Sequence, residues 1–230
     1  MALIQSGVSS STLMTVDPTF NASRVSIRPI EQLGTYGVGA FTGNYTGAGA
    51  NTPLFSMRFV AGSAGSAQIA VIQRITISFI QTTAFTTAQQ MGFGLYVARS
   101  FTGNDSGGTQ INLAGNNQKL RTSYPTSQIA TNGDMRIAST GALSAGSRTL
   151  DTQAFSVGHG WGGSVLQTTG AIQPSLLTLY EEFPGDTPLV LQTNEGLVIN
   201  NIVAMGAGGV FTIGVNVEWT ESASSTTNAY

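Results

Sequence analysis

The last apolar segment of the chain alternates between two kinds of side chain. From Val210 to Thr220, large apolar residues occupy every second position, and polar residues or glycine occupy the positions between them. Side chains of a β-strand point alternately to opposite faces of a sheet, so this period of two predicts a strand with one buried face. An amphipathic helix would need a period of about 3.6 residues, and no segment of useful length shows it. The apolar positions are Phe211, Ile213, Val215, Val217 and Trp219.

Other segments show the same alternation or short β-branched runs. They cover residues 52–60, 68–81, 91–98, 175–180, 187–193 and 196–203. Within residues 68–81 the alternation assigns Ile69, Val71, Ile75, Ile77 and Phe79 to one face and Ile72 to the other. Residues 194–196 predict a short hairpin turn. Gly92 and Gly94, on one face of their segment, predict close approach of another backbone.

Seven or eight strands joined by glycine-rich turns, without a long helix, predict an all-β fold. The simplest arrangement is an antiparallel β-sandwich of the jelly-roll type, and the lack of a fixed repeat argues against a propeller or solenoid. We expect an extended N-terminal arm over residues 1–33, a single sandwich domain over residues 34–221 and a polar C-terminal tail over residues 222–230. Residues 99–173 are expected to form a long loop-rich insertion within the domain, with residues 158–163 as turn material.

Charged residues are scarce in this chain. Asp, Glu, Lys and Arg make up 9% of the 230 residues, against about 25% in an average soluble domain. No apolar run approaches the roughly 20 residues of a membrane-spanning helix, and a net charge of −2 with 41% hydrophobic residues does not fit a disordered chain. A surface with few charges tends to associate, so we expect neighbouring molecules to cover it. The alternative is an extracellular β-domain with a surface rich in Ser and Thr.

The charges also limit the partners. Lys119 is the only lysine, and a near-neutral chain lacks the clustered basic face that binds nucleic acid. We therefore expect neither nucleic acid nor a membrane as partner. Residues 1–8 have no basic region before their short apolar patch, so they do not form a secretory signal. This predicts synthesis in the cytoplasm without a signal peptide, followed by release on lysis or by residence there.

The sequence offers little material for catalysis. Cysteine is absent and His159 is the only histidine, which excludes thiolate chemistry and sites with several histidine ligands. Adjacent Glu181 and Glu182 point to opposite faces of a strand, and Glu218 lies on the polar face of the last strand, so a glycosidase carboxylate pair is not indicated. Residues 104–107 hold oxygen ligands without the register of a calcium loop. We predict a protein that is not an enzyme and uses no cofactor.

Arginine supplies every basic residue except Lys119. The planar guanidinium forms several directed hydrogen bonds, which favours arginine at interfaces. The alternative is that these arginines pair within the chain, with Asp17, Asp134 or Asp151. The predicted interface residues are Phe20, Arg24 and Arg28 in the arm, Arg121, Arg136 and Arg148 in the insertion, and His159 with Trp161 as a loop anchor.

Several segments resemble structural proteins of tailed bacteriophages, in particular capsid decoration (cement) proteins. They are residues 116–123, residues 135–143 with 148–151, and residues 188–191 and 194–196 leading to 215–219. The resemblance covers residues 50–220. It implies a jelly-roll domain that binds the outer capsid shell of the virion as a homo-oligomer, often a trimer. There it would clamp neighbouring subunits of the major capsid protein, without catalytic residues.

Two other functions stay open. A phage tail or fibre module for carbohydrate binding or host attachment would present Trp161, Tyr36 and Tyr45 at a shallow site. A sandwich hydrolase would depend on Glu182 or Glu218.

Overall fold

The computed structural model describes residues 32–62, 68–164, 175–183 and 187–223. Residues 1–31 of the predicted arm and residues 224–230 of the predicted tail lie outside this part. The first strand begins at Gln32 and the last ends at Ala223. The sandwich therefore extends two residues beyond the predicted domain at each end.

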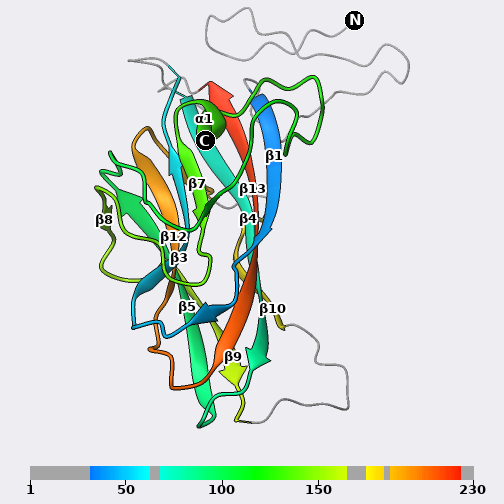
Figure 1. The fold of residues 1–230 in the computed structure, drawn as a ribbon. Helices are drawn as coiled ribbons and strands as arrows, with labels where there is room; N and C mark the ends of the chain where they lie inside the picture. Colours follow the sequence, from blue (N-terminus) through cyan, green and yellow to red (C-terminus); the bar gives the residue numbers. More distant parts are fainter. Residues whose placement is uncertain (1–31, 63–67, 165–174, 184–186, 224–230) are drawn as a thin grey trace, which may run out of the picture. The chain divides into compact units, whose positions relative to one another are not determined.

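Eight long strands build the domain (Figure 1). They are β1 (Gln32–Phe41), β3 (Thr52–Phe59), β4 (Gln68–Thr83), β5 (Gln89–Arg99), β9 (Ser156–Gly162), β10 (Ser175–Glu181), β12 (Glu195–Asn201) and β13 (Val210–Ala223). The shorter elements are β2 (Tyr45–Thr46), β6 (Thr109–Gln110), β7 (Asp134–Ile137), β8 (Thr149–Leu150), β11 (Leu189–Leu191) and the single-turn helix α1 (Gln128–Thr131).

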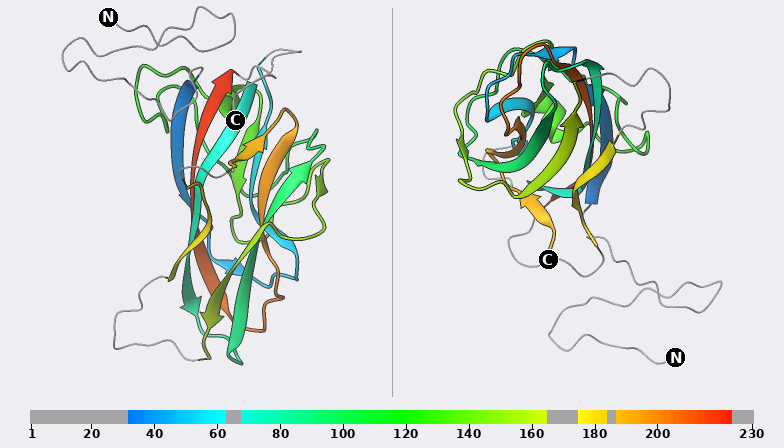
Figure 2. Two further views of the ribbon diagram at one scale, coloured as in Figure 1. Left: turned by 180° about the vertical axis from the view of Figure 1, so that it is seen from behind. Right: turned by 90° about the horizontal axis from the view of Figure 1, so that it is seen from below.

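The strands form two antiparallel sheets, which lie face to face in Figure 2. In the first sheet the order is β1-β13-β4-β10, with β2 and β11 added to β13 and β4. In the second sheet β7, β3, β12, β5 and β9 follow one another, with β6 and β8 at the margins. When the eight long strands are numbered in chain order, the first sheet has the order first-eighth-third-sixth. The second sheet has the order second-seventh-fourth-fifth. This is the strand order of a jelly roll of two Greek keys, so the predicted fold is confirmed.

The core lies between the two sheets, and β13 contributes its centre. The five alternating apolar side chains predicted to face inward on β13 are each at most 1% exposed. The ring of Phe211 contacts Phe79 at a centroid distance of 5.4 Å and Tyr45 at 5.3 Å, and Trp219 stacks on Tyr36 at 5.4 Å. Such ring pairs add about 0.5–1.5 kcal/mol each beyond the area that they bury.

A β-bulge in β4 changes the predicted faces of that strand. Glu218 lies opposite Arg74 but Trp219 lies opposite Ile72, which leaves Gln73 as an extra residue. An extra residue reverses the alternation on one side of the bulge. Ile72 therefore joins the central apolar cluster, whereas Val71 does not. The predicted assignment is correct for Ile75, Ile77 and Phe79 and wrong for Ile69, Val71 and Ile72.

The insertion is shorter than predicted. It lies between β5 and β9, over residues 100–155, and holds β6, α1, β7 and β8. The predicted turn at residues 158–163 is wrong, because residues 156–162 form β9 of the second sheet. The predicted hairpin at residues 194–196 is also wrong, since β11 and β12 pair in different sheets. What lies close over Gly92 is not another backbone, as predicted, but the side chains of Ile202 and Val203, which a Cβ atom there would approach to 2.8 and 2.9 Å.

Candidate interaction surface on β9

One face of β9 carries a row of exposed side chains. Val157, His159 and Trp161 alternate along the strand, and Phe155 precedes it in the same alternation. Phe155, Val157 and Trp161 are 53%, 52% and 66% exposed. The imidazole Nδ1 of His159 lies 2.6 Å from the amide nitrogen of Gln90 on β5. We call these four residues, at positions 155, 157, 159 and 161, the β9 strip.

After Ser156, the other face of β9 carries only glycines, which pack on the core. A Cβ atom at Gly158 would lie 3.1 Å from Leu177, and one at Gly160 would lie 3.2 Å from Phe79. At Gly162 it would lie 2.5 Å from the fully buried ring of Phe85. The glycines therefore let β9 approach the opposite sheet closely. Apart from Ser156, every side chain of the strand stands on its outer face.

The outer edge of β9 is open in the described part of the chain. β9 pairs with β5 on one side, and no strand among the described residues pairs with its other side. The edge of the first sheet at β1 is different, because the insertion covers it. There Gly37 N–H donates to Gln118 at 3.0 Å and Leu120 N–H donates to Thr35 at 3.1 Å. An open edge strand can accept another strand, and β9 has no charged residue or proline to prevent this.

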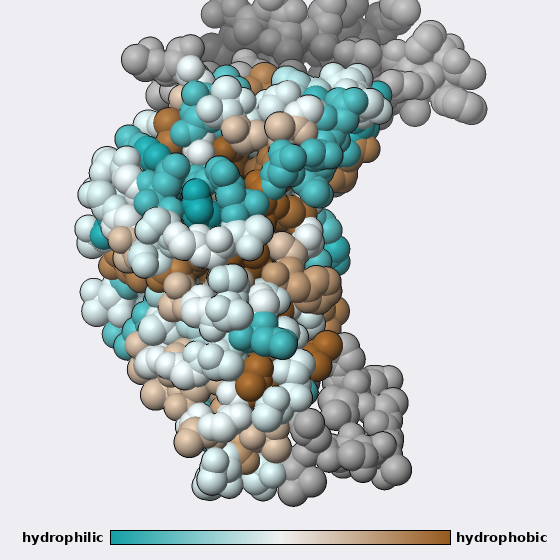
Figure 3. Space-filling model, in the orientation of Figure 1, coloured by the Kyte–Doolittle hydropathy of each residue, from teal (hydrophilic) through white to brown (hydrophobic). Residues whose placement is uncertain are grey.

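The edge strand β10 of the first sheet adds further apolar surface beside β9. The ring of Phe155 meets that of Tyr180 edge-on, with 5.8 Å between centroids. Leu176 on β10 and Phe183 just after it are 67% and 59% exposed. Strongly hydrophilic side chains gather in the upper half of the face in Figure 3, whereas the lower half, around β5, β9 and β10, is mostly pale or brown. Leu176 and Phe183 thus add exposed apolar side chains beside those of β9.

Of the arginines predicted for an interface, Arg148 is placed in the interior. Its guanidinium forms a 2.6 Å ion pair with Asp105, and the two side chains are 4% and 0% exposed. The guanidinium carbon also lies 5.3 Å from the ring centre of Phe101, and burial lowers the pKa of Arg148. Gly146 N–H donates to the other carboxylate oxygen of Asp105 at 2.8 Å. This pair ties two parts of the insertion together and leaves neither charge available to a partner or to a calcium ion.

Arg136 also pairs within the chain, as the alternative predicted. Its Nε lies 2.7 Å from the buried carboxylate of Asp134. Arg121, by contrast, is exposed and lies over the ring of Tyr124 at 5.6 Å. Of the predicted interface residues, the structure brings only His159 and Trp161 together, and it places them on a strand rather than in a loop. Phe20, Arg24 and Arg28 lie outside the described residues.

Two members of the β9 strip, Phe155 and Val157, were missed by the sequence analysis. The signal that could have found them is the spacing of Phe155, Val157, His159 and Trp161, which are separated by single small residues. The high glycine content of this segment favours a turn and masks the period of two.

A further buried charge belongs to Glu221 on β13, at the last position of the predicted sandwich domain. Its carboxylate accepts hydrogen bonds from the Ser127 hydroxyl at 2.6 Å, the Gln128 N–H at 2.8 Å and the Trp219 indole at 3.2 Å. Burial raises the pKa of Glu221 above its ordinary value, although these donors oppose the shift. Glu221 thereby anchors the start of α1, and with it the insertion, to the last strand.

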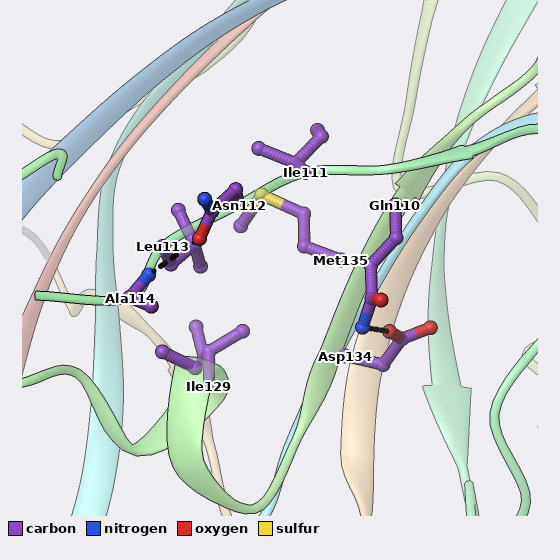
Figure 4. Close-up of a pocket in the computed structure, with 9 residues that line it drawn as sticks. Gln110, Ile111, Asn112, Leu113, Ala114, Ile129, Asp134 and Met135 are labelled. Atoms are coloured by element: carbon purple, nitrogen blue, oxygen red, sulfur yellow. Dashed lines mark hydrogen bonds between the residues drawn. The ribbon is translucent and has the colours of Figure 1, made fainter.

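The described residues contain no group of three or more His, Cys, Asp or Glu side chains that could hold a metal ion. A hollow of about 180 Å³ lies between α1, β7 and residues 110–114 (Figure 4). Its polar wall is already satisfied, since the Gln110 amide donates to Asp134 at 2.8 Å. Ile111, Leu113 and Met135 are also among the lining residues. Glu218, on which a sandwich hydrolase was predicted to depend, lies on the surface instead, where its carboxylate forms a 2.6 Å ion pair with Arg74.

No protein-family model matches the chain, and a search of curated proteins finds no significant relative. No helix in the described part of the chain has the length and hydrophobicity to cross a membrane. The fold and the β9 strip are therefore the findings that bear on function.

Proposed function

We propose that this protein is a virion structural protein, a decoration protein that binds the outer capsid shell as a homo-oligomer and stabilises it. The observation that carries the proposal is the β9 strip, a row of large exposed side chains on an open edge of a jelly-roll domain. Apolar rows of this kind mark interaction sites on soluble proteins. The resemblance of residues 50–220 to capsid decoration proteins supplies the proposed partner, the major capsid protein.

The use of charge in the domain supports an assembly role. Four of its arginines are engaged in ion pairs with carboxylates of the same chain, at Arg74, Arg99, Arg136 and Arg148. A surface with little free charge does not repel copies of itself. On a capsid the same weak contact is repeated by symmetry, so modest binding at each site becomes strong overall.

The test compares virions that contain this protein with virions from which its gene has been deleted. Cryo-electron microscopy is expected to show extra density at symmetry-related positions on the outer shell, and heating is expected to release the genome earlier when the protein is absent. The mass of the purified protein in solution is measured in parallel. A stable monomer that does not bind the capsid would refute the proposal.

The alternative, a carbohydrate-binding module of a tail or fibre, keeps one of its three predicted aromatic residues. Trp161 is exposed, but Tyr36 and Tyr45 are 1% and 0% exposed and belong to the core. The prediction that these two tyrosines line a glycan site is therefore wrong. Glycan binding that is lost in Trp161→Ala, without capsid binding by the intact protein, would favour this alternative over decoration.

A further inference from the structure

We propose that the β9 strip is the contact between two copies of this chain, which join through antiparallel pairing of their β9 strands. The inference rests on the proposed function only in that both require self-association. It goes further because it assigns the surface, the partner and the register.

The open edge of β9 supplies the hydrogen bonds for such a pairing. Every second residue of an edge strand directs its N–H and C=O away from the sheet, where another strand can bind them. With β5 on one side and a second β9 on the other, the two second sheets would continue as one sheet across the contact. The strip is free of Asp, Glu, Lys and Arg, so two identical strips meet without repulsion between like charges.

The order of side chains in the β9 strip fits one register best. If the two-fold axis passes through Gly158, Phe155 of one copy lies opposite Trp161 of the other, and Val157 lies opposite His159. The contact between the two strips thus contains two Phe155–Trp161 pairs, one at each end, and two Val157–His159 pairs near the centre. Aromatic cross-strand pairs contribute up to about 1 kcal/mol each relative to alanine. Moving the axis to His159 would leave Phe155 without an aromatic partner.

The available area predicts a weak contact. Phe155, Val157 and Trp161 are each more than half exposed, and at aromatic side-chain areas of 150–250 Å² the strip buries on the order of 400 Å² per copy. Two copies would bury roughly 800 Å² from these side chains, below the roughly 1,200 Å² of stable specific complexes. The pair is therefore expected to form at micromolar concentrations and to strengthen where copies are held side by side.

A two-fold contact joins copies in pairs. A trimer, as implied by the resemblance, would need a different surface in addition. A trimer that also uses β9 would appear as a hexamer in solution, and a trimer that does not would leave the β9 strips apart. Mass measurement and cross-linking together distinguish these cases.

The absence of cysteine from the chain makes the register directly measurable. Two single variants, Val157→Cys and His159→Cys, are mixed and oxidised. Residues opposite each other have Cβ atoms about 4.5–5.5 Å apart, whereas diagonal neighbours are about 7–8 Å apart, too far for a disulfide. The mixture is expected to give a cross-linked pair of one Val157→Cys chain and one His159→Cys chain. Ser123→Cys, at an exposed position on the insertion, controls for random oxidation.

Each outcome decides the register or the surface. Efficient cross-linking of His159→Cys with itself would overturn the Gly158 axis in favour of an axis at His159. Cross-linking of the mixture no greater than that of Ser123→Cys would overturn β9 pairing altogether.

A second variant tests the surface without cysteine. Trp161→Glu places a charge opposite the apolar ring of Phe155 of the other copy, and loss of a tryptophan anchor alone commonly weakens association by about thirtyfold or more. Leu120→Ser is the matched control, because Leu120 is 59% exposed and lies on the insertion. We expect Trp161→Glu to be monomeric at concentrations where wild type and Leu120→Ser associate, with an unchanged melting temperature. Association of Trp161→Glu equal to wild type would refute the inference, whereas loss of pairing with intact capsid binding would confirm the pairing surface independently of the capsid site.

Discussion

Removing the guanidinium of Arg148 is expected to destabilise the domain strongly, although the sequence marked this residue for a surface contact. In Arg148→Met the carboxylate of Asp105 stays 0% exposed and keeps the N–H of Gly146, but it loses its only ion-pair partner among the described residues. Methionine fills part of the volume above Phe101 without carrying charge. The domain must then bury an uncompensated anion or open the insertion to water.

The magnitude follows from the burial of the pair. Breaking a buried ion pair by removing one partner costs about 3–5 kcal/mol. For a domain of this size each kcal/mol lowers the melting temperature by about 2–4 °C, so a decrease on the order of 10 °C is expected. Arg99→Met is the control, because Arg99 pairs with Asp151 and Glu195 while about half exposed (48%). An exposed pair contributes at most about 1 kcal/mol.

Differential scanning calorimetry and urea unfolding of the two single variants measure the difference. The double variant Asp105→Asn/Arg148→Met also removes the negative charge of Asp105. It is therefore expected to lose less stability than the sum of the two single variants. Equal melting temperatures for Arg148→Met and Arg99→Met would refute the reasoning. If Arg148→Met instead kept its stability and lost self-association, the prediction of Arg148 as an interface residue would be supported.

Three further changes test other parts of the structure. Gly162→Ala is expected to cost about 1–3 kcal/mol, because its methyl group would lie 2.5 Å from Phe85, whereas Gly141→Ala, with no atom within 4 Å of the added carbon, is expected to be nearly neutral in urea unfolding. The raised pKa of Glu221 means that its contribution to stability is fullest below its ordinary pKa and is lost as the pH rises through the folded-state value. Glu221→Gln lacks this loss, so its stability relative to wild type is expected to improve from pH 4 to pH 7; a constant difference across urea titrations at these pH values would contradict the shift. Tyr36→Phe removes the hydrogen bond from the Tyr36 hydroxyl to the Pro125 carbonyl at 3.0 Å and is expected to cost about 1 kcal/mol, and a thermal shift equal to that of Gly141→Ala would argue against that bond.

Most of the sandwich could be predicted because its strands alternate. In β13 the period of two is unbroken and the predicted core face is correct at every position. In β4 a single bulged residue, Gln73, reverses the pattern, and nothing in its local sequence distinguishes an inserted residue from a regular one. The carbohydrate-binding alternative expected Tyr36 and Tyr45 at a surface, and both are buried. The glycines beside Tyr36 hide the alternation of β1, so its stacking on Trp219 became visible only in the fold.

The pairing of charges was predicted less well, because it depends on contacts between distant residues. Arg136 and Asp134 are close in sequence, and their pairing was among the alternatives. Arg148 and Asp105 are 43 positions apart, and they meet because the insertion folds back on itself over the second sheet. Sequence pattern gives the periodicity of one strand, whereas such an ion pair is fixed by how two loops pack.

The construction of β9 makes self-association separable from folding. Gly158, Gly160 and Gly162 face the core and carry no side chain, so the stability that β9 contributes comes from its backbone and from the rings and aliphatic chains packed beneath it. The large side chains of the strip stand on the outer face, where they add little to the core. Their replacement is therefore expected to leave the melting temperature unchanged while it alters the mass in solution. A strand that served only to close the sandwich would gain nothing from exposing Phe155 and Trp161, since apolar surface left in water contributes no folding energy. This separation of the two faces is what favours a second copy, rather than the domain itself, as the partner of the β9 strip.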